Sequence, residues 1–235
     1  MNANSENFSA AERISHVKPL SGLNEKVLGP HTAVIVIDVQ NDFCADEGTM
    51  AKEGFDMADA QAMAARLPDF LSTARAAGAL VVFVRNVYSS DQNYYLSDVW
   101  LEQAARARVG SYTKYPVCPD GTWEGDYYGD VSPEPNDARV IKHRFNAFLN
   151  TDLDTILRAN GIRTLIMTGV ATNVCVESTA RDGFMRDYYI VFPSDGTAAY
   201  SRDDHDATLR NIGRFFGEVC TLSDVENIWM SNEEK

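Results

Sequence analysis

The chain has 235 residues, of which 45% are apolar, and a formal net charge of −13 at pH 7. This length predicts one α/β domain, or one domain with a long excursion, with enough apolar residues for a sizeable core. The acidic balance and the lack of Lys/Arg clusters argue against a nucleic-acid-binding protein. No apolar run approaches the roughly 20 residues that a membrane helix needs, so we expect no membrane partner either.

The cysteines and the first residues of the chain bear on its compartment. The first 30 residues are polar and contain no apolar segment typical of a secretory signal. The four cysteines are widely spaced and form no CxxC pair: Cys44, Cys118, Cys175 and Cys220. Such spacing does not indicate a disulfide framework in a chain of this length. We therefore expect a cytoplasmic protein with reduced thiols.

In chain order, short apolar runs alternate with stretches of helical character. The runs that we expect to be strands are 33–37, 80–84, 139–141, 165–167 and 188–192, with a weaker sixth at 218–222. Most are continuous rather than alternating, which is typical of strands buried on both faces of a parallel sheet. Helices are expected over 57–77, 153–159, 174–186 and 205–216. This order predicts a Rossmann-like three-layer α/β/α fold with a mostly parallel sheet of about six strands.

Three segments lie outside this alternation. Residues 1–30 are expected to form an N-terminal arm, and residues 226–235 a C-terminal tail. Between them, a main domain over 31–225 carries a long insertion at 86–137, with at most one helix around 97–108. Loops of this length are usually lids, binding loops or oligomer contacts.

Polar residues follow three of the predicted strands at the same edge of the sheet. Asp38 comes directly after the first strand, Lys142 directly after the third, and Cys175 a few residues after the fourth. Ligands bind at this edge of open parallel sheets. Taken singly, a loop-capping Asp, a surface lysine and a buried cysteine are simpler explanations. Taken together, the three residues predict a nucleophile with an acid–base partner and a cation.

Cys175 is expected near the start of a helix that begins around Asn173. The free N–H groups and partial positive charge of a helix N-terminus favour a thiolate, so we expect a lowered thiol pKa. The same N–H groups can hold an oxyanion. Asp38 is expected to take the thiol proton and later give it to a leaving nitrogen. Lys142 is expected to stabilise the thiolate and hold the carboxylate in place.

Three segments of the sequence resemble the isochorismatase-like cysteine hydrolases. They are Val-Ile-Asp-Val-Gln-Asn-Asp-Phe at 36–43, Ile-Lys-His-Arg-Phe-Asn-Ala-Phe at 141–148 and Thr-Gly-Val-Ala-Thr-Asn-Val-Cys-Val at 168–176. They occur in the family's order, and the resemblance extends over roughly residues 31–222. Three separate motifs make it highly specific.

The resemblance implies a catalytic site and its chemistry. It implies that Asp38, Lys142 and Cys175 form the catalytic triad. It also implies a non-proline cis peptide between Val170 and Ala171, with the amides of Ala171 and Cys175 forming the oxyanion hole.

Some members of this family are nicotinamidases that bind a metal through an Asp and a close pair of His after the second strand. Residues 85–93 contain no His here, and the four histidines of the chain, His16, His31, His143 and His205, are dispersed. We therefore expect no metal and no other cofactor. A metal-independent nicotinamidase-like enzyme is kept as an alternative.

Within the family, residues 171–184 are most similar to ureidoacrylate amidohydrolases and related ureido-cleaving enzymes, and Asn86 matches an Asn of that group. The resemblance implies cysteine-dependent hydrolysis of a C–N bond in a small ureido, carbamoyl or amide compound, through a thioester and with release of ammonia. His143 departs from this group, in which a proline is expected, and the lid candidate at 94–128 is not obviously the same. The exact substrate therefore stays open. A vinyl-ether-cleaving isochorismatase and a catalytically silent binding module are two further hypotheses.

Side chains around the triad give candidate contacts to a small-molecule substrate. The candidates are Gln40, Asn41, Phe43, Asn86, Tyr88, Trp123 and Phe148, with Tyr128 as a further possible wall. For the aromatic residues, packing is the simpler role. Members of the family also imply a homo-oligomer, a dimer or tetramer, with contacts from residues 1–30 or 86–137.

Overall fold

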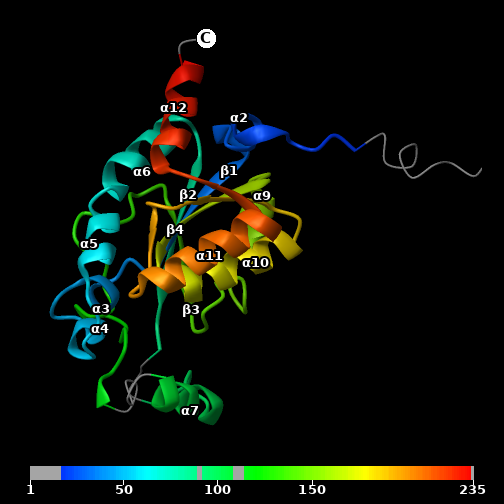
Figure 1. The fold of residues 1–235 in the computed structure, drawn as a ribbon. Coiled ribbons are helices and arrows are strands. Elements are labelled where there is room, and N and C mark those ends of the chain that lie inside the picture. The colour runs from blue at the N-terminus through cyan, green and yellow to red at the C-terminus, as the bar shows by residue number, and fades with distance from the viewer. Residues whose placement is uncertain (1–16, 89–91, 108–113, 234–235) are drawn as a thin grey trace, which may run out of the picture.

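A seven-stranded sheet with helices on both faces forms the centre of the protein (Figure 1). The computed structural model describes residues 17–88, 92–107 and 114–233. The strands are β1 Thr32–Ile37, β2 Leu80–Asn86, β3 Ala138–Lys142, β4 Thr164–Val170, β5 Tyr189–Pro193, β6 Thr197–Ala198 and β7 Gly217–Cys220. Their order is β3-β2-β1-β4-β5-β7, with β6 beside β4, and the pairings between them are parallel. The expected three-layer fold is confirmed, and β6, which is too short to show as an apolar run, is the additional strand.

The two helical layers pack on opposite faces of the sheet (Figure 1). One layer consists of α3 Asn41–Cys44, α4 Thr49–Lys52, α5 Ala58–Ala64, α6 Leu67–Ala76 and α12 Leu222–Glu233. The other consists of α9 Leu153–Ala159, α10 Glu177–Met185 and α11 Arg202–Phe215. Val34 and Val36 of β1 belong to the first apolar core, and Ile35 and Ile37 to the second. Because successive side chains of a strand point to opposite faces, a continuous apolar run is what this position requires.

The direction in which successive strands are added to the sheet reverses at β1, which lies between β2 and β4. From β1 the chain winds outward to β2 and β3, and it then returns to β4 on the other side of β1. Gly169 of β4 is paired with Ile37 of β1. It has a φ of +105°, and a Cβ placed on it would lie 2.0 Å from the carbonyl oxygen of Ile37. A glycine is therefore required for the end of β4 to approach β1 so closely.

Two expectations about helices need correction. The helix expected over 57–77 is two helices, α5 and α6, which separate at residues 65–66. Pro68 occupies the first turn of α6, where its missing N–H costs no helical hydrogen bond and favours a new start.

The C-terminal tail expected at 226–235 lies largely within α12. Trp229 is 3% exposed, and its indole nitrogen donates a hydrogen bond to the carbonyl of Val27 at 2.6 Å. Part of the expected arm also forms helices, α2 Gly22–Lys26 and the short 3-10 helix η1 Gly29–His31. Residues 1–16 of the arm and residues 234–235 lie outside the described part of the chain.

Candidate active site

Asp38 follows β1 directly, at the point where the chain turns away from the sheet. Its φ is +53°, a left-handed conformation that non-glycine residues adopt rarely and only where surrounding contacts hold them. Its amide donates to the carbonyl of Val84 at 2.9 Å, and its carbonyl accepts from the amide of Gln40 at 2.8 Å. The backbone of Asp38 is thus held by β2 on one side and by the following turn on the other.

The structure brings the three predicted triad residues together from three different elements. The Nζ atom of Lys142, at the end of β3, lies 2.8 Å from Oδ2 of Asp38 and 3.5 Å from Sγ of Cys175. Cys175 lies in η2 Thr172–Val176, a π-helical turn between β4 and α10. Asp38, Lys142 and Cys175 are 1%, 0% and 8% exposed, so their charges interact with little screening by water.

Lys142 and Asp38 form a buried ion pair with opposing influences on each pKa. Burial raises the pKa of Asp38, and the nearby Lys142 ammonium counteracts part of that rise. Burial lowers the pKa of Lys142, but attraction to Asp38 and Cys175 outweighs burial and leaves it above its ordinary value. Nζ also donates to the carbonyl of Arg144 at 3.1 Å, so the ammonium has three partners.

The expectation of a lowered thiol pKa is wrong for Cys175. Burial raises its pKa to about 12, and Lys142 offsets only part of this effect. A short π-helical turn in a buried position does not compensate for the loss of water around a thiolate. The thiol of Cys175 is therefore neutral near pH 7 beside the Lys142–Asp38 ion pair, and its proton must leave as the sulfur attacks.

Hydrogen bonds fix the turn that carries Cys175. The hydroxyl of Thr179 donates to the carbonyl of Cys175 at 2.7 Å and accepts from the amide of Ala147 at 3.0 Å. At the other end of the turn, Thr172 shares a hydrogen bond with the ring of His205 at 2.9 Å. These contacts tie η2 to α10, to α11 and to the segment after β3.

The peptide bond between Val170 and Ala171 is cis, as the resemblance implied. Val170 ends β4 and Ala171 precedes η2, and both line the cavity beside Cys175. Ala171 and Cys175, the two residues whose amides are expected to form the oxyanion hole, therefore both line the cavity.

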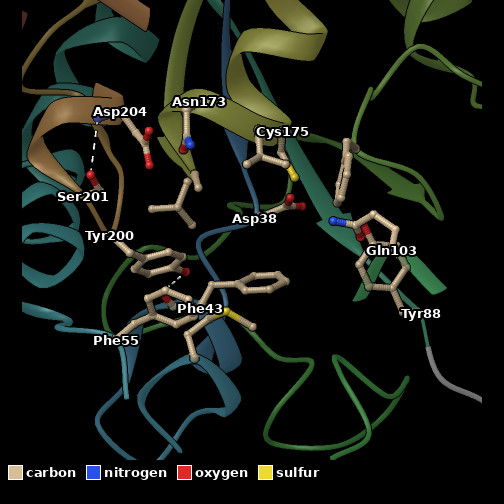
Figure 2. Close-up of a pocket in the computed structure, with 15 residues that line it drawn as sticks. Asp38, Phe43, Phe55, Tyr88, Gln103, Asn173, Cys175, Tyr200, Ser201 and Asp204 are labelled. Atoms are coloured by element: carbon tan, nitrogen blue, oxygen red, sulfur yellow. Dashed lines mark hydrogen bonds between the residues drawn. The ribbon is translucent and has the colours of Figure 1, made fainter. Parts of the chain in front are cut away.

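A cavity of about 370 Å³ opens beside Asp38 and Cys175 (Figure 2). Its walls come from the segment after β1, from α4, α7 Asp98–Ala107, η2 and the start of α11. The other lining residues are Phe43, Met50, Phe55, Tyr88, Gln103, Phe145, Val170, Ala171, Asn173, Val174, Tyr200, Ser201 and Asp204. This volume suits a small molecule of a few to a dozen heavy atoms.

Two of the expected substrate contacts, Phe43 and Tyr88, line this cavity. Gln40 and Asn41 instead hold the scaffold together. The Gln40 amide accepts from the backbone of Asn86 at 2.7 Å and donates to its carbonyl at 3.0 Å, and the Asn41 amide donates to the carbonyl of Trp123 at 2.7 Å. Their positions beside the triad therefore serve to fix the ends of β1 and β2.

The remaining expected contacts lie outside the cavity lining. Trp123 is 49% exposed, whereas Phe148 is buried and stacks on Tyr188. Tyr128 packs against the first apolar core. Asn86 is fully buried next to Lys142 in the strand register, and its side-chain amide has no hydrogen-bond partner among the described residues.

Sequence reasoning missed the walls that distant segments contribute. Gln103 comes from α7, Tyr200 and Ser201 come from the segment that leads into α11, and Asp204 comes from the first turn of α11. One signal was available: Ser201-x-x-Asp204 is a helix-start pattern, and Ser201 is indeed the N-cap, accepting from the Asp204 amide. The pattern places the helix start before His205 but does not reveal that this start borders the cavity.

Membrane-spanning helices and metal sites are both absent from the part of the chain that the structure describes. No helix among the described residues is both long and apolar enough to cross a lipid bilayer. No group of three or more His, Cys, Asp or Glu side chains within 17–88, 92–107 and 114–233 is arranged to hold a metal ion.

Comparison with known proteins identifies similar sequences and structures. The family model described as the isochorismatase domain matches residues 32–224. Ureidoacrylate amidohydrolase RutB of Rhizobium rhizogenes is 36% identical over 203 residues, covering 82% of this chain and 81% of the relative. The protein of that name from Caulobacter vibrioides is 37% identical, covering 82% and 88%. The crystal structure of a cysteine hydrolase from Pseudomonas syringae superposes with a TM-score of 0.75 at 29% identity, covering 91% of this chain and 98% of that one.

Proposed function

The chain belongs to the isochorismatase family, and on this premise we propose that it is a cysteine-dependent amidohydrolase of small amides or ureido compounds. Cys175 is the nucleophile, Asp38 the acid–base group and Lys142 the cation that holds them in place. The single observation that carries this assignment is the contact of Lys142 Nζ with both the Asp38 carboxylate and the Cys175 sulfur, beside a cavity of suitable size.

In the first step, the Cys175 sulfur attacks the carbonyl carbon while Asp38 takes the thiol proton. Charge that develops on the carbonyl oxygen is stabilised by the amides of Ala171 and Cys175. The C–N bond then breaks, and Asp38 gives its proton to the leaving nitrogen. Because the resting thiol is neutral, Asp38 must accept the proton as the sulfur attacks, which places the two groups in direct cooperation.

In the second step, water attacks the thioester, and Asp38 takes a proton from it. A primary amide then yields a carboxylic acid, with ammonia already released in the first step. A monosubstituted urea yields an amine and carbamate, which decomposes to ammonia and carbon dioxide. Both substrate classes therefore release one ammonia for each bond cleaved.

Ammonia release tests this proposal. We would screen ureidoacrylate, N-carbamoyl amino acids, biuret-type compounds, simple amides including nicotinamide, and isochorismate. Wild-type protein should release ammonia from at least one amide or ureido compound. Cys175→Ser should reduce this rate by about 1,000-fold or more, because an alkoxide is much harder to form than a thiolate at the same site.

Cys220→Ser is the matched control, since Cys220 is a half-buried thiol in β7 that does not line the cavity. It should keep the wild-type rate. Turnover of isochorismate without ammonia release, or wild-type rates in Cys175→Ser, would contradict the proposal.

We also infer that the protein acts in the cytoplasm as a homo-oligomer. The four cysteines are free, which suits a reducing compartment. Phe184, Met185 and Phe215 expose 42%, 70% and 59% of their surface on neighbouring helices α10 and α11. An exposed apolar patch of this kind is typical of a contact between subunits. Light scattering of the purified protein tests the assembly directly.

A further inference from the structure

We propose that the cavity selects uncharged or cationic substrates with an apolar group and discriminates against carboxylates. This inference rests on the proposed function, because it refines the substrate class of the same site. It also sets the chain apart from the relatives named ureidoacrylate amidohydrolase, since ureidoacrylate bears a carboxylate.

Aromatic and thioether side chains line one side of the cavity. The rings of Phe55 and Tyr200 lie 5.2 Å apart, and the Tyr200 hydroxyl donates to the carbonyl of Phe43 at 2.9 Å (Figure 2). Met50 also lines the cavity and is 2% exposed. These side chains favour contact with an apolar group of a substrate, but they provide no charge that would compensate for the lost hydration of a charged group.

The formal charges that face the cavity are negative. Asp38 lies at its base, where Lys142 already neutralises it, and Asp204 lies at its mouth, beside Asn173 (Figure 2). Asp204 is exposed on the first turn of α11, and no cation is paired with it in the described part of the chain. Among the described residues that line the cavity there is no Lys, Arg or His.

Arg144 does not supply the missing cation, because it is committed elsewhere. Its guanidinium lies 4.9 Å from the ring centre of Trp100 and donates to the carbonyl of Tyr95 at 2.9 Å. A substrate carboxylate would therefore lose water without gaining an ion pair from the described residues, and it would approach the exposed Asp204. The net charge of −13 opposes an anion at longer range as well.

Matched amides test the inference by catalysis. We would compare ammonia release from benzamide with that from para-carboxybenzamide and para-(aminomethyl)benzamide, and from N-carbamoyl-β-alanine with that from its methyl ester. The neutral or cationic member should have a kcat/KM about 10-fold or more above the carboxylate, since an unpaired buried carboxylate is strongly disfavoured. Equal or better turnover of the carboxylates would overturn the inference while leaving the proposed function intact.

Alkylation of Cys175 tests the same inference without turnover. Iodoacetamide and iodoacetate are neutral and anionic reagents of nearly the same shape, and peptide mass spectrometry identifies the modified residue. The ratio of the alkylation rate with iodoacetamide to that with iodoacetate should be higher for Cys175 than for mercaptoethanol, a small neutral thiol in solution. Asp204→Asn should reduce this preference by about 3- to 5-fold, the size of an exposed charge–charge interaction.

Asp203→Asn is the matched control, since Asp203 lies on the same helical turn and is exposed, but does not line the cavity. It should leave the preference unchanged. A preference for iodoacetate, or no response to Asp204→Asn, would overturn the inference. If no compound of either screen released ammonia, the proposed function would fail, and the alkylation ratio would still decide the charge preference of the cavity.

Discussion

Lys142 is the residue that links the other two members of the proposed triad. Its ammonium contacts the Asp38 carboxylate at 2.8 Å and the Cys175 sulfur at 3.5 Å, and it is fully buried. In this position it lowers the pKa of both acidic groups, although burial raises each of them by more. Its loss would therefore raise both pKa values further, so that less thiolate forms at Cys175 and a larger fraction of Asp38 is protonated.

Lys142→Met, which keeps an apolar chain of similar length, tests this role. Cys175 in the variant should be alkylated by iodoacetamide more slowly than in wild type at every pH between about 7 and 10, because less thiolate is present. Ammonia release should fall by about 100-fold or more, because less thiolate forms and a larger fraction of Asp38 is protonated and unable to act as the general base. Lys52→Met, at an exposed lysine of α4, should change neither rate. An unchanged alkylation profile in Lys142→Met would contradict the role of the lysine.

At the scale of elements, α7 is the helix of the long 86–137 segment that reaches the proposed active site, and Tyr88 of the same segment lines the cavity with it. Its Trp100 ring packs 4.6 Å from Phe145 and 5.9 Å from Tyr88, two residues that line the cavity. Gln103, one turn further along α7, lines the cavity itself, and its amide oxygen is buried without a hydrogen-bond partner in the described structure. Packing through Trp100 thus places a polar group of this long insertion beside the substrate space.

Trp100→Ala should weaken this placement without removing a triad residue. We expect KM to rise by about 10-fold with a smaller change in kcat, because the lost contact positions the substrate space rather than the reacting atoms. Val99→Ala is the control, since Val99 neighbours Trp100 in α7 but is 69% exposed. Steady-state kinetics with the best substrate of the screen provides the measurement. An unchanged KM in Trp100→Ala would show that α7 does not shape the site.

At the scale of the whole molecule, the sequence predicts best the features that strand topology dictates. Asp38, Lys142 and Cys175 were predictable because each comes after an apolar run, and the carboxyl ends of parallel strands meet at one edge. The cavity walls formed by Gln103 and Asp204 could not be predicted. These residues are far apart in the chain, and no local sequence pattern indicates that they lie close together. The raised thiol pKa was missed for a similar reason: burial depends on the complete packing around the site.

The C-terminal helix was also missed, and it contributes to the stability of the whole fold. Trp229 of α12 packs its ring 5.4 Å from Phe70 of α6 and bonds to the backbone of Val27. Trp229→Ala should lower the free energy of unfolding by about 3–5 kcal/mol, the usual cost of removing a large buried aromatic side chain. Met230→Ala, at a neighbouring residue that is 52% exposed, should change it by less than about 0.5 kcal/mol. Urea denaturation measures both, and equal stabilities would mean that α12 is dispensable.

A covalent intermediate on Cys175 would be the most direct sign that this residue is the nucleophile. During turnover of the best substrate, rapid acid quenching and then mass spectrometry should find the acyl or carbamoyl group of the substrate attached to the peptide that contains Cys175. The adduct should be absent from Cys175→Ser handled in the same way. Rapid turnover with no adduct on this peptide, or an adduct at another residue, would contradict the role of Cys175.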